Sequence, residues 1–154
     1  MADEMAASDY VALMERQKKP RSKYRAQRVR IDGHTFPSKL EGARYLELKQ
    51  MEDLGLISDL ELQPSFDLKG ESGAIIARYQ ADFSYWELNT EYPQNDPPYG
   101  SGEFVIEDTK GMANRLFALK RKWLKADHGI DLRITTSKDV DTRGMDAYVI
   151  EDEA

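Results

Sequence analysis

The sequence predicts a single α/β domain in which a helix is followed by three strands, a second helix and one more strand. Two helices are indicated by apolar residues at helical spacing, over residues 38–54 and 112–127. Short apolar or alternating runs, which are typical of strands, lie at residues 60–68, 74–88, 103–111, 131–136 and 147–150. A chain of 154 residues can bury a sizeable core, and no internal repeat divides it. We expect an N-terminal arm at residues 1–22, one domain at 23–150 and an acidic tail at 151–154.

Composition excludes several classes of protein. The chain has no cysteine, so it has neither a disulfide framework nor a thiolate metal site. The first seven residues carry acids where a secretory signal carries lysines or arginines. No apolar run approaches the ~18 residues that a membrane span needs. We therefore expect a cytoplasmic protein with no membrane partner.

Charge is unevenly distributed along the chain. The net charge is −6, yet residues 15–49 carry eleven bases and four acids, and residues 110–125 carry six bases and no acid. The segment between them, residues 50–109, carries thirteen acids and two bases. Two basic blocks on either side of an acidic middle can form a phosphate-binding surface around a cluster of carboxylates. Ordinary solvated faces are the alternative interpretation.

The first basic block begins as an arm and continues into a hairpin. Pro20 interrupts a helix there and Tyr24 is available for stacking, so the arm suits a phosphate backbone; a tail that serves only solubility is the alternative. The candidate nucleic-acid contacts in this block are Lys18, Lys19, Arg21, Lys23, Arg25 and Arg28. The pair Asp32-Gly33 then predicts a tight turn, with His34 as a surface residue beside it.

The helix over residues 38–54 carries the first candidate acid. Glu41 lies at the edge of the predicted buried face, from which its carboxylate can face a cleft. That face consists of Leu40, Ala43, Leu48, Met51 and Leu54. Ser38 and Glu41 also have the spacing of a capping box, in which the Glu41 carboxylate would bond back to the start of the helix. Both interpretations stay open.

The strands after this helix contain a proline and a second acid. Pro64 places the run 60–68 near a sheet edge or at a bulge, because proline cannot donate to a ladder. Alternation along 74–88 predicts one face made of Tyr79, Ala81, Phe83 and Tyr85. Asp82 lies on the other face, in an apolar stretch where a carboxylate is costly unless it is paired or bound to a metal. A solvent-facing aspartate is the simpler alternative.

After a predicted loop at 89–102, the run 103–111 leads from a short strand into two acids, a lysine and a glycine. Alternation puts Asp108 and Lys110 on one face and Glu107 on the other. A carboxylate followed two residues later by a lysine can hold a divalent metal and position water, although an ion pair at a sheet edge is the simpler alternative. Alternation favours Asp108 as the ligand, whereas a twist or bulge would turn Glu107 inward.

The second helix is expected to begin at Met112 and end near Asp127. Its core stripe consists of Leu116, Phe117, Trp123 and Leu124. Lys120 projects within this stripe, where its side chain either snorkels to solvent or reaches the site. The outer face is basic and contains Arg115, Arg121, Lys122 and Lys125.

The acid on the first helix, the aspartate on the second strand and the acid-x-Lys motif on the third resemble the PD-(D/E)XK nuclease superfamily. More closely, the chain is similar to a family of phage nucleases described as Holliday-junction-resolvase-like. The similarity covers about residues 22–137, and its motifs are Lys23-Tyr24, Val29-Arg30-Ile31-Asp32-Gly33, Phe36-Pro37-Ser38-Lys39-Leu40-Glu41, Leu60-Glu61-Leu62-Gln63-Pro64, Tyr79-Gln80-Ala81-Asp82-Phe83 and Val105-Ile106-Glu107-Asp108-Thr109-Lys110-Gly111. The chain departs from the commonest signature by having Ala81, not proline, before Asp82, and Asp108 where glutamate is usual.

The resemblance implies a restriction-endonuclease-like core, a mixed sheet flanked by helices, with an N-terminal basic arm and hairpin. It implies that Asp82, Asp108 and the Thr109 carbonyl ligate Mg²⁺ or Mn²⁺. Glu41 would complete the acidic cluster directly or through a water. Lys110 would position or help deprotonate the attacking water, and Lys120 would contact the scissile phosphate. Hard oxygen ligands suit these cations, which can support phosphodiester hydrolysis.

We therefore expect a Mg²⁺-dependent endodeoxyribonuclease that cleaves branched DNA during phage recombination or genome processing, in the host-cell cytoplasm. Symmetric resolution of a four-way junction would require a homodimer. A nucleic-acid-binding module with a degenerate nuclease site is the main alternative. A protein-interaction domain with incidental charge clusters is the third.

Overall fold

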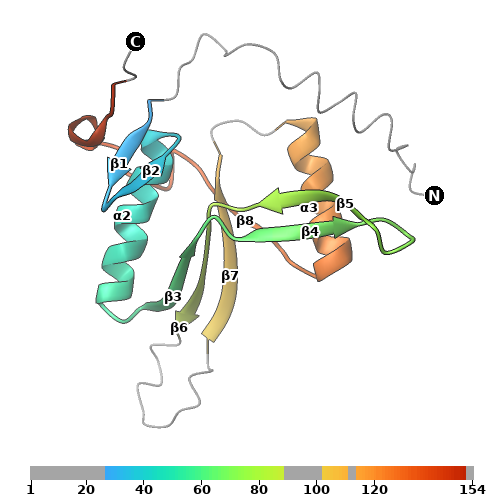
Figure 1. The fold of residues 1–154 in the computed structure, drawn as a ribbon. Helices are drawn as coiled ribbons and strands as arrows, with labels where there is room; N and C mark the ends of the chain where they lie inside the picture. Colours follow the sequence, from blue (N-terminus) through green and yellow to red (C-terminus); the bar gives the residue numbers. More distant parts are fainter. Residues whose placement is uncertain (1–26, 89–101, 111–113, 152–154) are drawn as a thin grey trace.

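A four-stranded mixed sheet with one helix on each face organises the chain (Figure 1). The computed structural model describes residues 27–88, 102–110 and 114–151. Its helices are α2 (Lys39–Asp53), α3 (Arg115–His128) and the 3₁₀ helix η1 (Met145–Tyr148). Its strands are β1 (Val29–Ile31), β2 (His34–Phe36), β3 (Ile57–Leu62), β4 (Ser65–Lys69), β5 (Ile75–Gln80), β6 (Phe83–Leu88), β7 (Gly102–Thr109) and β8 (Arg133–Thr135). The expected arm and the candidate contacts from Lys18 to Arg25 lie outside the described residues.

The main sheet has the strand order β3-β6-β7-β8. The β3/β6 and β6/β7 pairs are antiparallel, and β8 joins β7 in parallel through α3. Parallel strands need a crossover connection of this kind, because a tight turn reverses the chain and can join only antiparallel strands. The expected α/β class and mixed sheet are confirmed. Among the described residues, no helix combines the length and apolar character needed to cross a bilayer.

Each face of this sheet is covered by a different helix. Val105 of β7 is buried in a core with Ala43 and Leu48 of α2. Its neighbour Ile106 is buried in a second core with Leu124 of α3. Successive strand residues point to opposite faces, so β7 contributes to both cores. Side chains at the end of β7 are therefore presented to both layers.

Each of the runs 60–68 and 74–88 contributes to two strands instead of the one expected from the sequence, and the break in the first run falls at the irregularity predicted for Pro64. The two breaks lie opposite each other. The end of the first run and the start of the second pair as a separate β4/β5 hairpin. At the break, Gln63 N donates to Asp82 O at 2.9 Å and Ala81 N donates to Pro64 O at 2.9 Å. Gln63 has a φ of +54°, and Pro64 offers no N–H to a ladder. The ribbon therefore bends here.

This bend overturns the single aromatic face predicted for residues 74–88. Tyr79 and Ala81 pack in the core beneath α3, whereas Phe83 and Tyr85 pack in the core beneath α2. Strict alternation holds only while a strand stays in one sheet. Asp82 consequently lies at a corner between two sheets, outside the ladder of either one.

The buried face of α2 differs in part from the predicted one. It begins after Ser38, whose Oγ accepts from Glu41 N at 3.1 Å, and its buried residues are Glu41, Gly42, Ala43, Tyr45 and Leu48. Leu54, expected in the core, is 68 % exposed because the helix ends before it. A Cβ added at Gly42 would lie well inside the van der Waals distance of Val29 Cγ2, so α2 and β1 approach closely at this point.

The ends of the domain agree with the sequence in part. Asp32 and Gly33 both have positive φ, which confirms the predicted tight turn, and His34 is exposed as expected. The strand expected at 147–150 is wrong: η1 occupies its start, and a single bridge joins Val149 to Val29. With only three residues, β1 offers too short an edge for a longer ladder. Asn114 caps α3, so this helix begins at Arg115 instead of Met112.

Candidate functional site

The two consecutive acids of β7 point to opposite faces of the sheet. Glu107 is 0 % exposed and lies beneath α2, where its carboxylate accepts from Arg44 Nε at 2.7 Å and Arg44 Nη2 at 2.8 Å. The Tyr85 hydroxyl adds a third hydrogen bond at 2.7 Å. Burial alone would lower the pKa of Arg44, but the hydrogen bonds and charge of Glu107 raise it. Burial, with the charge of Glu107, raises the pKa of Tyr85 to about 12. Glu107 therefore belongs to a satisfied internal ion pair.

Asp108 lies on the α3 face and is 1 % exposed. Its Oδ1 accepts from Asp82 N at 2.9 Å, and its Oδ2 accepts from the Tyr79 hydroxyl. Lys110 Nζ lies 4.0 Å from the same Oδ2. Burial raises the pKa of Asp108, although Lys110 and the Asp82 amide oppose the change. The carboxylate is thus fixed in position but is incompletely neutralised.

Asp82 is held by the residue that follows Asp108. Its Oδ2 accepts from Thr109 N at 2.7 Å and from Thr109 Oγ1 at 2.8 Å. Each aspartate therefore receives a backbone N–H from the other's segment, which locks the bend against the end of β7. Burial raises the pKa of Asp82, and the hydrogen bonds from Thr109 oppose this.

Glu41 brings a third carboxyl group to this place from the first turn of α2. Its side chain is buried, with 4 % of the residue exposed, and its carboxylate makes no hydrogen bond with any described residue. The return bond of a capping box is therefore absent within the described chain, and only the Ser38 half of that motif forms. Burial and the charges of Asp82 and Asp108 raise the pKa of Glu41 to about 8, although Lys110 lowers it.

Lys110 supplies the positive charge of the cluster. Its ammonium lies 4.7 Å from the centroid of the Phe117 ring, within the range of a cation–π contact. Because its 4.0 Å distance from Asp108 exceeds hydrogen-bonding length, the Lys110 ammonium keeps donors available for water or phosphate. Its side chain is 34 % exposed, so the cluster is accessible from solvent.

Two candidate DNA contacts fall within the described residues but outside this cluster. Lys120 Nζ donates to the Arg78 carbonyl at 3.3 Å, and burial lowers the pKa of Lys120. Lys120 thus reaches β5 and makes no contact with the acids. Arg28 precedes β1, and its carbonyl accepts from Ile150 N at 3.0 Å.

The donor set suits a hard divalent cation, although the side chains are not gathered around one point. Within residues 27–88, 102–110 and 114–151, no three acidic or histidine side chains form a group that could hold a metal ion as they stand. Both oxygens of Glu41 and Oδ1 of Asp82 nevertheless accept no hydrogen bond from described residues. A cation stabilises carboxylates in this condition, of which Glu41 is buried and Asp82 half-buried. Oxygen ligands are those that Mg²⁺ and Mn²⁺ prefer.

Sequence reasoning missed the polar partners that hold the acids. Alternation predicts Tyr79 on an aromatic face, but it does not identify the partner that a buried tyrosine usually needs for its hydroxyl. The resemblance implies a role for the Thr109 carbonyl but none for the Thr109 side chain, which donates to Asp82. Arg44 could have been suspected because it lies one turn after Glu41, next to buried positions of α2.

Comparison with known proteins identifies a family without assigning an activity. A family model described as "Protein of unknown function (DUF1064)" matches residues 21–140, which include both α-helices, α2 and α3, and all the acids of the candidate site with Lys110. Searches of curated proteins and of solved structures found no match. Because the model covers well over half of the chain, this protein belongs to the DUF1064 family.

Proposed function

We propose that this protein is a metal-dependent endonuclease that hydrolyses phosphodiester bonds in DNA. The observation that carries the proposal is that Glu41, Asp82 and Asp108 lie close enough for the charges of the two aspartates to act on Glu41, with Lys110 beside them. Burial raises the pKa of all three carboxyl groups. Two buried acids and one half-buried acid with perturbed pKa values, beside one accessible lysine, are typical of a catalytic site.

The order of the elements supports a restriction-endonuclease-like core. Helix α2 is followed by β3, β6 and β7 of the main sheet, then by α3 and the parallel strand β8. This is the helix, three strands, helix, strand order that the resemblance to PD-(D/E)XK nucleases implies. The β4/β5 hairpin is inserted between β3 and β6, and the bend that creates it holds Asp82 at the site.

Asp82, Asp108 and Glu41 would hold Mg²⁺ or Mn²⁺, with the Thr109 carbonyl as a further oxygen donor. A bound cation supplies charge neutralisation at the phosphate and lowers the pKa of water. Lys110 then orients the attacking water or a phosphate oxygen with its free donors. Tyr79 and the Asp82 amide keep the Asp108 carboxylate from rotating. Preorganised groups of this kind lower the cost of reaching the transition state.

The substrate proposed is branched DNA, cut in the cytoplasm by a homodimer. Two sites in one dimer would match the two strands that must be cut to resolve a four-way junction symmetrically. This part of the proposal rests on the resemblance to junction-resolving phage nucleases and on the basic blocks of the sequence.

Cleavage of an end-labelled four-way junction in Mg²⁺ tests the roles of Asp108 and Lys110. We expect Asp108→Asn and Lys110→Met each to slow cleavage by about 10²–10⁴-fold, the range for losing a positioned catalytic group. Glu103→Gln is the matched control, since it removes one charge from an exposed position of the same strand. Cleavage by Asp108→Asn at the rate of the control would overturn the assignment. Binding of DNA without cleavage by the wild type, in either metal, would favour a non-catalytic module.

A further inference from the structure

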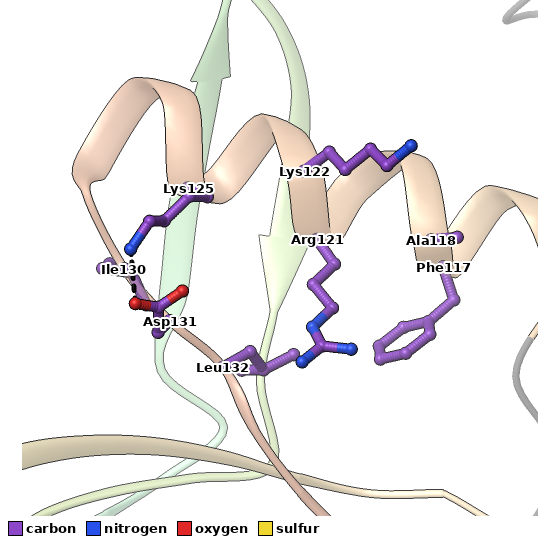
Figure 2. A pocket seen from close by; sticks show the side chains of 8 residues that line it. All are labelled: Phe117, Ala118, Arg121, Lys122, Lys125, Ile130, Asp131 and Leu132. Carbon is purple, nitrogen blue, oxygen red and sulfur yellow. Dashed lines mark hydrogen bonds and ion pairs between the residues drawn. The ribbon is translucent and has the colours of Figure 1, made fainter.

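A hollow of about 420 Å³ lies between α3 and the segment that leads into β8 (Figure 2). Its lining includes the apolar side chains of Phe117 and Leu132 and the charged side chains of Arg121, Lys122, Lys125 and Asp131. Apolar side chains and cations are thus combined in one concave surface, a composition suited to a ligand that is both anionic and partly apolar.

Like Lys122, Arg121 is a cation of this hollow that has no partner among the described residues. Its guanidinium makes no hydrogen bond or ion pair with any described residue. Figure 2 shows this side chain descending from α3 beside Leu132, with the guanidinium directed toward the Phe117 ring. Lys125, by contrast, is ion-paired with Asp131. A planar guanidinium with five donors and no partner is the group best matched to a phosphate.

The hollow adjoins the candidate catalytic site through one side chain. The Phe117 ring lines the hollow and also lies 4.7 Å from Lys110 Nζ. Arg121 follows Phe117 by one helical turn, so its side chain is a neighbour on the same face of α3. A polymer with one phosphate at Lys110 would therefore have its next units beside Phe117 and Arg121.

We propose that this hollow binds the unpaired DNA strand adjoining the scissile phosphate. Arg121 holds a phosphate of that strand, while the half-buried ring of Phe117 packs against its sugar and base. Charge complementarity selects this occupant: residues 110–125 carry six bases and no acid, and the one acid that lines the hollow, Asp131, is paired with Lys125. The identity of the polymer rests on the proposed nuclease function. The inference adds a substrate feature, an unpaired strand at the branch.

Two substitutions in the hollow should change DNA affinity in opposite directions. Arg121→Gln removes one phosphate contact, so affinity for a fluorescein-labelled single-stranded oligonucleotide should fall about tenfold, with the salt slope reduced by about 1. Asp131→Asn removes a negative charge and releases Lys125, so affinity should rise. Binding is measured by anisotropy in EDTA, which separates it from cleavage. A duplex of the same sequence should show a smaller loss with Arg121→Gln, because stacked bases cannot enter the hollow.

Arg143→Gln is the matched control for Arg121→Gln. It makes the same charge change at a side chain that is 91 % exposed and paired with Asp141, in the part of the chain that packs on α2. Equal affinity of Arg121→Gln and Arg143→Gln, equal losses on single strand and duplex, or no binding of DNA by the wild type would each overturn the proposal. If Arg121→Gln binds like the control while Asp108→Asn abolishes cleavage, strand binding by the hollow is wrong and the nuclease assignment is supported. If Arg121→Gln weakens binding but the wild type never cleaves DNA, strand binding by the hollow is supported and the nuclease assignment is wrong.

Discussion

Replacing Glu41 by glutamine tests the electrostatics of the site without requiring a substrate. Glutamine has nearly the same shape as glutamate but cannot ionise. In the folded protein the Glu41 pKa is raised from 4.5 to about 8, by burial first and then by Asp82 and Asp108. In the unfolded chain Glu41 titrates near its usual value. The two states therefore differ in bound protons between about pH 4.5 and pH 8.

The sign and size of the effect follow from this difference. Between these pH values the folded state holds a proton that the unfolded state has lost, so the free energy of unfolding falls as pH rises. The contribution of the protonated Glu41 carboxyl to the free energy of unfolding is fully present below pH 4.5 and is lost as pH rises through the folded pKa near 8. A difference of 3.5 pH units corresponds to about 5 kcal/mol at most, at 1.36 kcal/mol per unit. The substituted glutamine side chain is neutral throughout, so Glu41→Gln should be the more stable protein above pH 8 and similar to the wild type near pH 4.

Urea unfolding of both proteins in EDTA, between pH 4 and pH 9, measures this difference. Tryptophan fluorescence follows the transition, since the chain has two tryptophans. We expect the stability curves to diverge steadily as pH rises, and Mg²⁺ at pH 9 to recover stability in the wild type more than in Glu41→Gln. Curves that stay parallel across this range would refute the claim that Glu41 is held as a buried acid among like charges.

Two further predictions concern the supports of the site. Arg44→Met leaves Glu107 buried without its bidentate partner and should lower the free energy of unfolding by about 3–5 kcal/mol. Adding Glu107→Gln should restore part of the lost stability. An Arg44→Met variant as stable as the wild type would contradict the ion pair. Gly42→Ala places a Cβ against Val29 Cγ2 and should cost about 1–3 kcal/mol in thermal or urea unfolding; Val29→Ala in the same chain should relieve the clash, and additive losses in the double variant would argue against it.

The parts of the fold that depend on local chemistry could be predicted from the sequence. Asp32-Gly33 indicated the hairpin because both residues tolerate positive φ. Ser38 marked the start of α2 through its side-chain cap. The mixed sheet flanked by helices followed from the order of apolar periodicities.

The break at Ala81–Asp82 could not be predicted in the same way. The alternation of residues 74–88 continues unchanged through this point, and the cause lies in the partner strand, where Gln63 and Pro64 end the ladder. Pro64 was recognised as an irregularity, but no local signal shows that two irregularities face each other across strands.

The candidate site was predictable as a set of acids but its hydrogen-bond network was not. Alternation separated Asp108 from Glu107 correctly, because β7 is regular at its end. The pairing of Glu107 with Arg44 requires knowing that α2 crosses that face of the sheet. The bond from Tyr79 to Asp108 requires the bend that brings β5 over the end of β7.

The rate of DNA cleavage as a function of Mg²⁺ concentration tests the central claim most directly. We expect wild-type protein to cleave at least one member of a panel of labelled duplex, single strand, flap and four-way junction, with a rate that saturates in Mg²⁺ and is abolished by EDTA. Asp82→Asn should lose this activity while it keeps the affinity for DNA measured in EDTA. Cleavage by Asp82→Asn with the Mg²⁺ dependence of the wild type, or no cleavage of any substrate by the wild type, would contradict the account.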